Sequence, residues 1–350
     1  MALKDIIGQE RAIGILRGCI AKNRVPHALL FAGDEGIGKR LTAMNFAKAL
    51  NCRGPASGPP DTMSASLFEE TFPEAFAPET SAPLDACDAC PSCTKMERGN
   101  HPDLFIIAPE GEGRQVTVSA IRQLEEALSY KPFEGAWKIA IIDDAEKMNQ
   151  SAANAFLQTL EEPASRSVLI LISSRPDMIL PTIRSRCQRV SFSPLPLDTM
   201  SRLLQERFGH GESTEARLLS VLSAGRLGYA LGDDLIAQRD RHITLFSSMT
   251  ADLDNEVWED REDMESWFDW SQLVLRDIAV YAATGRTDIL VNHDRVETIK
   301  ALSQGAELRA ILKLARDLYN IKSRLLFNLN KQLTQNYVKL LLRKCLGRGA

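Results

Sequence analysis

Residues 33–40 read Gly-Asp-Glu-Gly-Ile-Gly-Lys-Arg and match the phosphate-binding pattern G-x-x-x-x-G-K-[ST] up to Lys39. In such a loop, backbone N–H groups and a helix N-terminus surround the phosphates, and the lysine neutralises their charge. The last Ser or Thr normally binds Mg²⁺, but Arg40 has no oxygen to offer. The sequence therefore predicts a loop that holds ATP or ADP weakly and suits neither Mg²⁺ nor hydrolysis. Its predicted residues are Gly33, Asp34, Glu35, Gly36, Ile37, Gly38, Lys39 and Arg40.

Three polar residues at the ends of apolar runs are predicted to join this site. Asp143 and Asp144 follow the run 139–142, and a carboxylate beside the loop can hold Mg²⁺ directly or through water. ATP-hydrolysing proteins of this pattern place a Glu after the Asp, and Asp144 is one methylene shorter. Ser173 could contact a γ-phosphate, although a hydroxyl at a strand end also serves local hydrogen bonds. For the acidic pair, a solvated turn is the alternative.

Four of the seven cysteines are spaced like the ligands of a metal ion. The two overlapping C-x-x-C turns at Cys87, Cys90 and Cys93 supply three thiolates, and Cys52 could supply the fourth. The 34 residues between Cys52 and Cys87 make an unusually long insertion. A dithiol redox pair or unrelated buried thiols are the alternatives, but the spacing favours a structural Zn²⁺ site.

Two arginines occur in the segment Pro181-Thr182-Ile183-Arg184-Ser185-Arg186-Cys187, just before a predicted strand. Composition alone would assign them to the solvated surface. At the rim of a nucleotide-binding core, however, an arginine can be presented to a phosphate, including one held by a neighbouring subunit.

These residues can act together only if strands deliver them to one edge of a sheet. Short apolar runs predict strands at 28–32, 104–107, 138–142, 168–172 and 188–192. Helical spacing occurs around them at 3–22, 39–50, 118–130 and 151–161. This alternation predicts an α/β core over residues 1–193, with a parallel sheet covered by helices on both faces.

The remainder of the chain is predicted to be all-α. Ser193-Pro194-Leu195-Pro196 ends the core, and no strand pattern follows it. Helices are predicted at 198–208, 214–223, 228–238, 256–283, 293–304 and 306–345. We expect a helical lid over 194–240 and a helical C-terminal domain over 241–350, with the cysteine module, about residues 50–100, inserted in the core.

The composition is that of a globular protein, with 44% hydrophobic and 25% charged residues and a net charge of −4. No apolar run reaches the roughly 18–20 residues of a transmembrane helix, and the N-terminus does not resemble a signal peptide, so we expect a cytoplasmic protein without a membrane partner. Residues 300–350 carry eleven Lys or Arg against two acids. Such a tail is usually a solvated or subunit-packing face, and the alternative is a surface for nucleic acid or an acidic partner.

Further motifs give a resemblance to a known family. They are Ile7-Gly8-Gln9-Glu10, Pro26-His27-Ala28-Leu29-Leu30-Phe31, His101-Pro102-Asp103, Asn154-Ala155-Phe156-Leu157-Gln158-Thr159-Leu160-Glu161-Glu162-Pro163 and Ser185-Arg186-Cys187. With the loop and the cysteine insertion, they resemble the clamp-loader subunits of bacterial DNA polymerase III, strongly over residues 1–235. The resemblance implies an AAA+ core, a small helical lid, a zinc module and a C-terminal collar that assembles five subunits into an open ring.

The resemblance also implies a role in chromosome replication. The ring opens a sliding clamp and loads it on primed DNA, so the partners would be the gamma/tau motor subunit, the delta subunit, the clamp and the DNA. Arg186 would be an arginine finger that acts in trans on ATP held by the adjacent motor subunit.

Three departures distinguish two types within this family. The motor type should carry Thr after the loop lysine, Glu after the strand Asp and an Arg in a lid motif, whereas this chain has Arg40, Asp144 and Gly228. They favour a non-motor, delta-prime-like subunit whose own ATPase is weak or absent. An ATP-hydrolysing gamma/tau-type motor is the alternative. A free-standing zinc-dependent DNA-binding protein is disfavoured, because basic residues are not in excess around the cysteines.

Overall fold

The computed structural model describes residues 1–54, 85–111, 114–208, 213–232, 234–251, 258–325 and 329–347. The chain divides into two compact units, Met1–Leu195 with Arg226–Gly228 and Pro196–Gly225 with Tyr229–Ala350. Most of the predicted insertion between Cys52 and Cys87 lies outside the described residues. The boundaries at residues 193 and 240 stay predictions.

The N-terminal unit is built on a parallel sheet whose strands, among the described residues, follow the order β2-β3-β4-β1-β5. The strands are β1 (Ala28–Ala32), β2 (Leu104–Ile107), β3 (Lys138–Ile142), β4 (Ser167–Ser173) and β5 (Gln188–Ser191). Each lies within one residue of its predicted range. Ala32 pairs with Ser173, so the end of β1 and the end of β4 meet at the edge where the predicted loop begins. The predicted α/β fold is confirmed.

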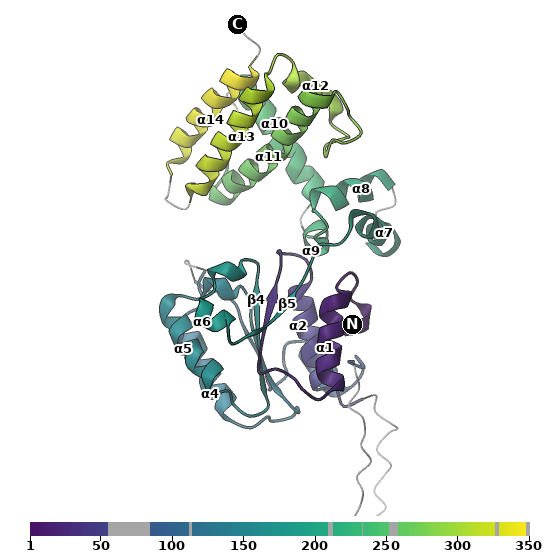
Figure 1. Cartoon of the computed structure of the whole chain (residues 1–350), viewed down its shortest axis with the longest axis vertical. Helices are drawn as coiled ribbons and strands as arrows, with labels where there is room; N and C mark the ends of the chain where they lie inside the picture. Colours follow the sequence, from purple (N-terminus) through teal and green to yellow (C-terminus); the bar gives the residue numbers. More distant parts are fainter. Residues whose placement is uncertain are drawn as a thin grey trace, which may run out of the picture. The chain divides into compact units, whose positions relative to one another are not determined.

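Helices cover both faces of this sheet, as Figure 1 shows, with α1 and α2 on one side and α4 and α5 on the other. The helices are α1 (Glu10–Ala21), α2 (Lys39–Leu50), α3 (Pro91–Glu97), α4 (Val118–Ser129), α5 (Gln150–Glu161) and α6 (Pro181–Arg184), with short 3₁₀ turns at Leu3–Asp5, Ala145–Lys147 and Pro176–Met178. Because β1, β3 and β4 are buried on both faces, their sequences are continuous apolar runs. Successive residues of β1, such as Leu29 and Leu30, enter opposite cores.

The C-terminal unit is helical throughout its described part, and Figure 1 shows α10–α14 packed as a bundle. Its helices are α7 (Leu197–Phe208), α8 (Ser213–Leu222), α10 (Leu235–Thr250), α11 (Arg261–Thr284), α12 (Val296–Ser303), α13 (Leu308–Ser323) and α14 (Lys331–Leu346). The one-turn helix α9 (Leu227–Ala230) follows α8 and is divided between the two units after Gly228. Trp258, Trp267 and Phe268 form the aromatic centre of the bundle. Among the described helices, none has the length and apolar character needed to cross a bilayer.

Two helix predictions in this unit were wrong. The range 306–345 contains two helices, α13 and α14, and the range 228–238 contains α9 and the start of the longer α10. In both cases a polar side chain starts a new helix. The Asn330 side chain accepts a hydrogen bond from the Leu333 N–H, and the Asp234 side chain accepts one from the Ala237 N–H. Asn and Asp are favoured caps, but their signal was outweighed by apolar periodicity that runs across both breaks.

Candidate functional site

The segment Gly33–Lys39 connects the end of β1 to the start of α2, the context that the phosphate-binding pattern requires. Gly38 caps α2 with a φ of 94°, in the left-handed region that favours glycine. A side chain at Gly33 would place its Cβ 2.6 Å from the Phe192 carbonyl oxygen, so this approach also requires glycine. The Gln9 amide donates to the carbonyls of Ile37 (3.2 Å) and Ser193 (2.7 Å), which ties the loop to the end of β5. The backbone frame of a phosphate loop is therefore present.

Lys39 is folded into this frame and is almost fully buried. Its Nζ donates to the carbonyl oxygens of Gly33 and Asp34, both at 2.6 Å. Burial lowers the pKa of Lys39, while the negative charge of Glu146 opposes the shift. The ammonium group thus lies against the loop that is predicted to receive phosphates.

The two predicted carboxylates lie next to the loop, and each has its own cation. The Arg40 guanidinium Nη1 is 3.2 Å from Asp143 Oδ2, and the Lys147 Nζ is 2.7 Å from Asp144 Oδ2. Burial raises the pKa of Asp143, and the Arg40 charge works against that rise. Asp144 adopts a left-handed φ of 47° and faces Lys147 rather than the loop's lysine.

A third carboxylate, Glu146, was missed by sequence reasoning. Its Oε1 accepts hydrogen bonds from the Ser174 hydroxyl (2.8 Å), the Ser174 N–H (3.2 Å) and the Arg175 N–H (3.2 Å). Its Oε2 is buried without a hydrogen-bond partner among the described residues. The predicted Ser173 is fully buried, and its hydroxyl accepts from the Arg175 N–H at 3.1 Å. The sequence feature that could have identified Glu146 is its position three residues after Asp143, on the turn that follows β3.

Gly228, which stands where the resemblance leads us to expect an arginine in a motor subunit, contacts the loop directly. Its N–H donates to the Gly36 carbonyl at 2.8 Å. A Cβ at this position would lie 2.9 Å from that oxygen, a distance that real Cβ atoms essentially never show. An arginine at 228 would therefore require the backbone to move.

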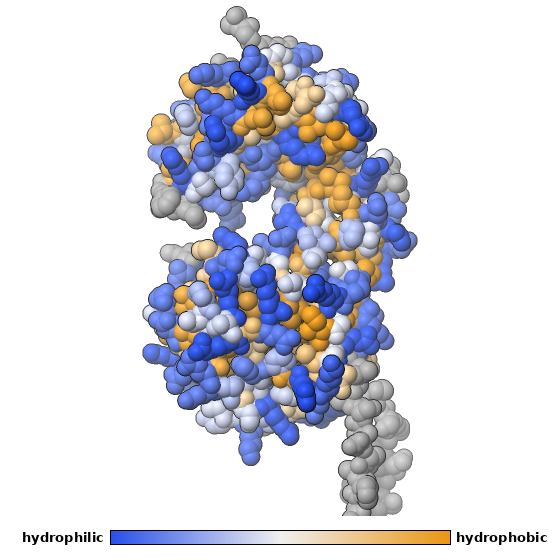
Figure 2. Space-filling model, viewed as in Figure 1, coloured by the Kyte–Doolittle hydropathy of each residue, from blue (hydrophilic) through white to orange (hydrophobic). Residues whose placement is uncertain are grey.

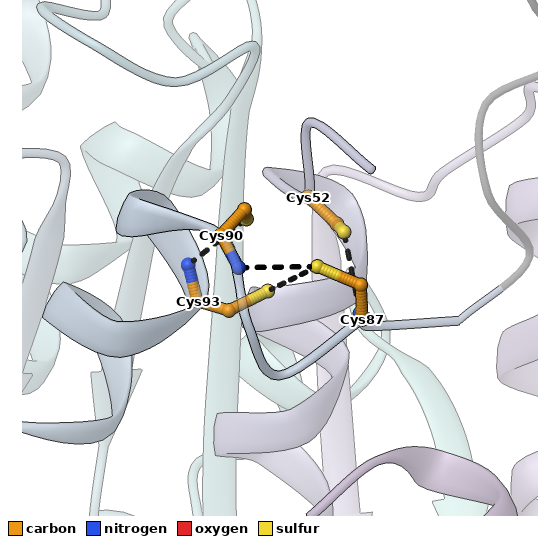
Figure 3. Close-up of side chains that lie close together, drawn as sticks. All are labelled: Cys52, Cys87, Cys90 and Cys93. Carbon is orange, nitrogen blue, oxygen red and sulfur yellow. Dashed lines mark hydrogen bonds between the residues drawn. The ribbon is translucent and has the colours of Figure 1, made fainter. Parts of the chain in front are cut away.

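The four predicted cysteines come together, and Figure 3 shows their side chains pointing toward one another. All four sulfur atoms lie within 4.8 Å of one another, and Cys87 Sγ is 4.0 Å from Cys93 Sγ. In a tetrahedral zinc–thiolate site, sulfurs are about 3.8 Å apart because each Zn–S bond is about 2.3 Å long. Cys52 belongs to the cluster despite the long insertion, so the donor set fits one zinc ion.

Backbone N–H groups point at several of these sulfurs. Cys52 Sγ accepts from the Cys87 N–H at 3.3 Å, and Cys87 Sγ accepts from the Cys90 N–H at 3.3 Å. Although burial works in the opposite direction, the N–H groups of Cys93 and Arg53 lower the pKa of Cys90 to about 7. Burial raises the pKa of Cys93 and Cys52. Metal binding requires thiolates, so the N–H donors favour the form that binds metal.

The cysteine module is anchored to the sheet core by apolar and charged contacts. Cys90 caps α3, and Met96 of the same helix is fully buried in the core beneath α2. The buried Lys48 ammonium of α2 pairs with Asp88, which lies inside the first C-x-x-C turn, and with Glu97 at 3.3 Å. The module is therefore positioned by the helix that begins at the phosphate loop.

A second connection runs through His101 and Asp103. The Ser92 hydroxyl of α3 lies 3.2 Å from His101 Nε2. Asp103 is fully buried, and its carboxylate accepts from the backbone N–H groups of three consecutive residues at 2.6–2.8 Å, Phe133, Glu134 and Gly135. This motif therefore fixes a turn beside the module.

Arg186 lies between α6 and β5, and its hydrogen bonds are made away from the loop. Its Nη2 is 2.7 Å from Glu161 Oε1, at the end of α5, and its Nη1 donates to the Thr182 carbonyl at 3.0 Å. The side chain is 38% exposed. Arg184, two residues earlier, pairs instead with Asp177 at 2.6 Å. Arg186 is thus held through both terminal nitrogens of its guanidinium and remains partly exposed.

Comparison with known proteins assigns the family. A sequence model of the family described as "DNA polymerase III, delta subunit" matches residues 8–70 and 61–196, more than half of the chain. The chain belongs to this family. A second model, "DNA polymerase III, delta subunit, C terminal", matches residues 255–343 in the helical bundle. The resemblance inferred from the motifs is confirmed.

Named relatives distinguish the types within the family. The chain is 27% identical to DNA polymerase III subunit delta' of Bacillus subtilis over 96% of both chains. It is 35% identical to the delta' subunit of Pseudomonas aeruginosa over 55% of this chain and 50% of that one. It is 29% identical to the tau/gamma subunit of Haemophilus influenzae over 72% of this chain but only 33% of that protein. The end-to-end match is with a delta' subunit, and the function is that of the delta' type in the clamp loader.

Proposed function

We propose that this chain is a non-motor subunit that occupies one position in a five-membered clamp-loader ring and presents Arg186 to ATP on the neighbouring motor subunit. Its partners are the gamma/tau motor and delta subunits, and through the complex it acts with the sliding clamp and primed DNA in the cytoplasm. The observation that carries this proposal is the contrast between the loop and Arg186. At the loop, Asp143 and Asp144 are paired with Arg40 and Lys147, which leaves neither carboxylate unpaired for Mg²⁺, whereas Arg186 is held only by a partly exposed contact to Glu161 and the Thr182 carbonyl and is itself 38% exposed.

The alternative is an ATP-hydrolysing gamma/tau-type motor. A motor needs a hydroxyl for Mg²⁺ and a carboxylate able to orient the attacking water. In this chain Arg40 is paired with Asp143, and Asp144 is paired with Lys147. These contacts support the non-motor type at two of the three positions where the sequence departs from the motor pattern.

The C-terminal unit supports assembly with other subunits. Figure 2 shows apolar residues among hydrophilic ones on its surface. Exposed apolar side chains occur on α13 and α14, and those most exposed are Leu312, Tyr319, Leu333, Tyr337 and Leu340. On α14 they recur at helical spacing, which places them on one face, as expected for a helix that packs against a partner.

The cysteine module is proposed to hold a structural zinc ion through Cys52, Cys87, Cys90 and Cys93. Four thiolates complete a tetrahedral coordination sphere, so no ligand position is left for catalysis. The ion would cross-link the end of α2 to α3 on either side of the long insertion.

The arginine-finger proposal is tested in a clamp loader reconstituted with motor and delta subunits, clamp and primed DNA. We expect Arg186→Ala to lower steady-state ATP hydrolysis by about 10³-fold, because a trans arginine contributes roughly 10³–10⁵ in rate. The matched control is Arg184→Ala, which removes a neighbouring half-exposed arginine paired with Asp177 and should retain activity. Unchanged hydrolysis in a correctly assembled Arg186→Ala complex would contradict the proposal.

A further inference from the structure

Arg40 occupies the first turn of α2, at the position where the phosphate-binding pattern carries Ser or Thr. It contacts the carboxylate at the end of β3, with Nη1 3.2 Å from Asp143 Oδ2, across 103 residues of sequence. The Asp143 side chain is only 20% exposed, whereas Arg40 is 59% exposed. The Arg40 guanidinium therefore contacts a carboxylate that is mostly shielded from solvent, while the Arg40 side chain itself remains largely exposed.

The residues at this position do not fit a magnesium ion. Magnesium takes oxygen ligands in an octahedral arrangement, and a guanidinium offers five N–H donors and no acceptor. The next hydroxyl along α2, Thr42, is fully buried and donates to the Gly38 carbonyl of its own helix at 2.9 Å. The Asp144 carboxylate is held by Lys147 at 2.7 Å. Position 40 therefore lacks the hydroxyl that would bind Mg²⁺, and the Asp143 carboxylate is already paired with the Arg40 guanidinium.

The same guanidinium is suited to the other task of the magnesium ion, which is to offset phosphate charge. Arg40 follows Lys39 directly, so two cationic groups stand at the start of the helix that opens the loop. Arginine binds phosphate oxygens through paired N–H donors and stays charged at any physiological pH. Within the described residues, Arg40 makes one hydrogen bond, from Nη1 to Asp143, so the other N–H donors of the guanidinium can bind an anion.

We propose that Arg40 replaces the divalent cation at Asp143, so that the loop binds a nucleoside triphosphate without magnesium. This inference rests on nucleotide binding at Gly33–Lys39 and specifies its cation requirement. At this site the positive charge that offsets the phosphates belongs to the Arg40 side chain. It is not supplied by a magnesium ion that binds together with the nucleotide.

The test is a fluorescence titration of the purified full-length chain with a fluorescent ATP analogue, in excess MgCl₂ and in excess EDTA. For the natural chain we expect dissociation constants that agree within about twofold in the two buffers, since a Kd ratio reports the free energy contributed by the cation. Arg40→Thr restores the hydroxyl and frees Asp143. We expect it to bind weakly in EDTA and at least about tenfold more tightly in MgCl₂, a difference of about 1.4 kcal/mol.

Two further variants define what the titration measures. Lys39→Ala should abolish binding in both buffers, which identifies the loop as the site. Arg40→Lys keeps the positive charge but loses the paired donors, so it should bind more weakly than the natural chain and remain indifferent to MgCl₂.

Three results would overturn the inference: binding by the natural chain that requires magnesium, an absence of binding in both buffers, or an Arg40→Thr variant that remains indifferent to magnesium. These failures are distinct from failure of the arginine-finger proposal. The Arg186 assay measures ATP hydrolysis at the site of a neighbouring subunit. This titration measures only nucleotide binding at the loop of this chain.

Discussion

The phosphate loop and the cysteine module lie at the two ends of the same helix, α2, and they differ in how their charged groups are satisfied. At the loop, Asp143 and Asp144 each face a basic side chain of the chain itself. In the module, four sulfurs face one another, and their hydrogen bonds within the described part of the chain come from backbone N–H groups and from one another. The two aspartates of the loop already have cationic partners, whereas the four sulfurs of the module form a donor set that a cation would complete. This difference is what the two proposals require, namely a loop that works without a divalent cation at one end of α2 and a structural zinc ion at the other.

The largest effect is expected from disrupting the module. Cys90→Ala removes a thiol whose pKa is lowered to about 7 and should reduce bound zinc from about one equivalent to near zero, because three remaining thiols leave the coordination sphere open. Elemental analysis of the purified chain measures this. Cys19→Ala, which removes a cysteine of α1 outside the cluster, should keep its zinc. Equal zinc in the two variants would contradict the assignment.

A smaller effect is expected at Asp103, which connects the module's side of the sheet to the turn at Phe133–Gly135. Asp103→Asn keeps the shape but removes the charge that three N–H donors face, so we expect the free energy of unfolding to fall by about 2 kcal/mol at pH 7. Urea denaturation measures this change. The exposed Asp177→Asn should change stability by less than about 0.5 kcal/mol.

The Asp103 effect should also depend on pH. Burial raises the pKa of Asp103, but the N–H groups of Gly135, Phe133 and Glu134 outweigh it and hold the pKa below its ordinary value of 3.8. A carboxylate whose pKa is lower in the folded state stabilises the fold above its unfolded pKa, and that contribution is lost as pH falls through the folded pKa. The difference between the natural chain and Asp103→Asn should therefore shrink below about pH 4. A difference that grows with acidification would exclude this origin.

The smallest change in stability is expected at Glu161, which holds Arg186. The pair is exposed, so Glu161→Gln should change stability by less than about 1 kcal/mol. In the reconstituted loader, the same variant should lower kcat for ATP about threefold and leave KM unchanged, because Glu161 orients the finger and does not bind the nucleotide. Glu162→Gln, at the adjacent position, is the matched control. An altered KM, or no effect on kcat, would show that the contact does not position the finger.

Sequence reasoning predicted the sheet, the position of the loop between β1 and α2, and the grouping of the cysteines, because each depends largely on local signals. Buried parallel strands are continuous apolar runs, the loop has a fixed glycine spacing, and the cysteines keep the spacing of C-x-x-C turns. It did not predict the contacts that decide the chemistry. The Arg40–Asp143 pair joins residues 103 positions apart, and the role of Glu146 depends on where β4 places Ser174. Such pairings follow from strand order and cannot be read from a local pattern.

The central claim is that the loop kept its backbone frame but lost the capacity for turnover. ATP hydrolysis by the purified chain alone, compared with its Lys39→Ala variant, tests this most directly. The account predicts that the two preparations hydrolyse ATP at the same background rate. Substantial hydrolysis by the natural chain that disappears in Lys39→Ala would contradict it and would favour the motor type.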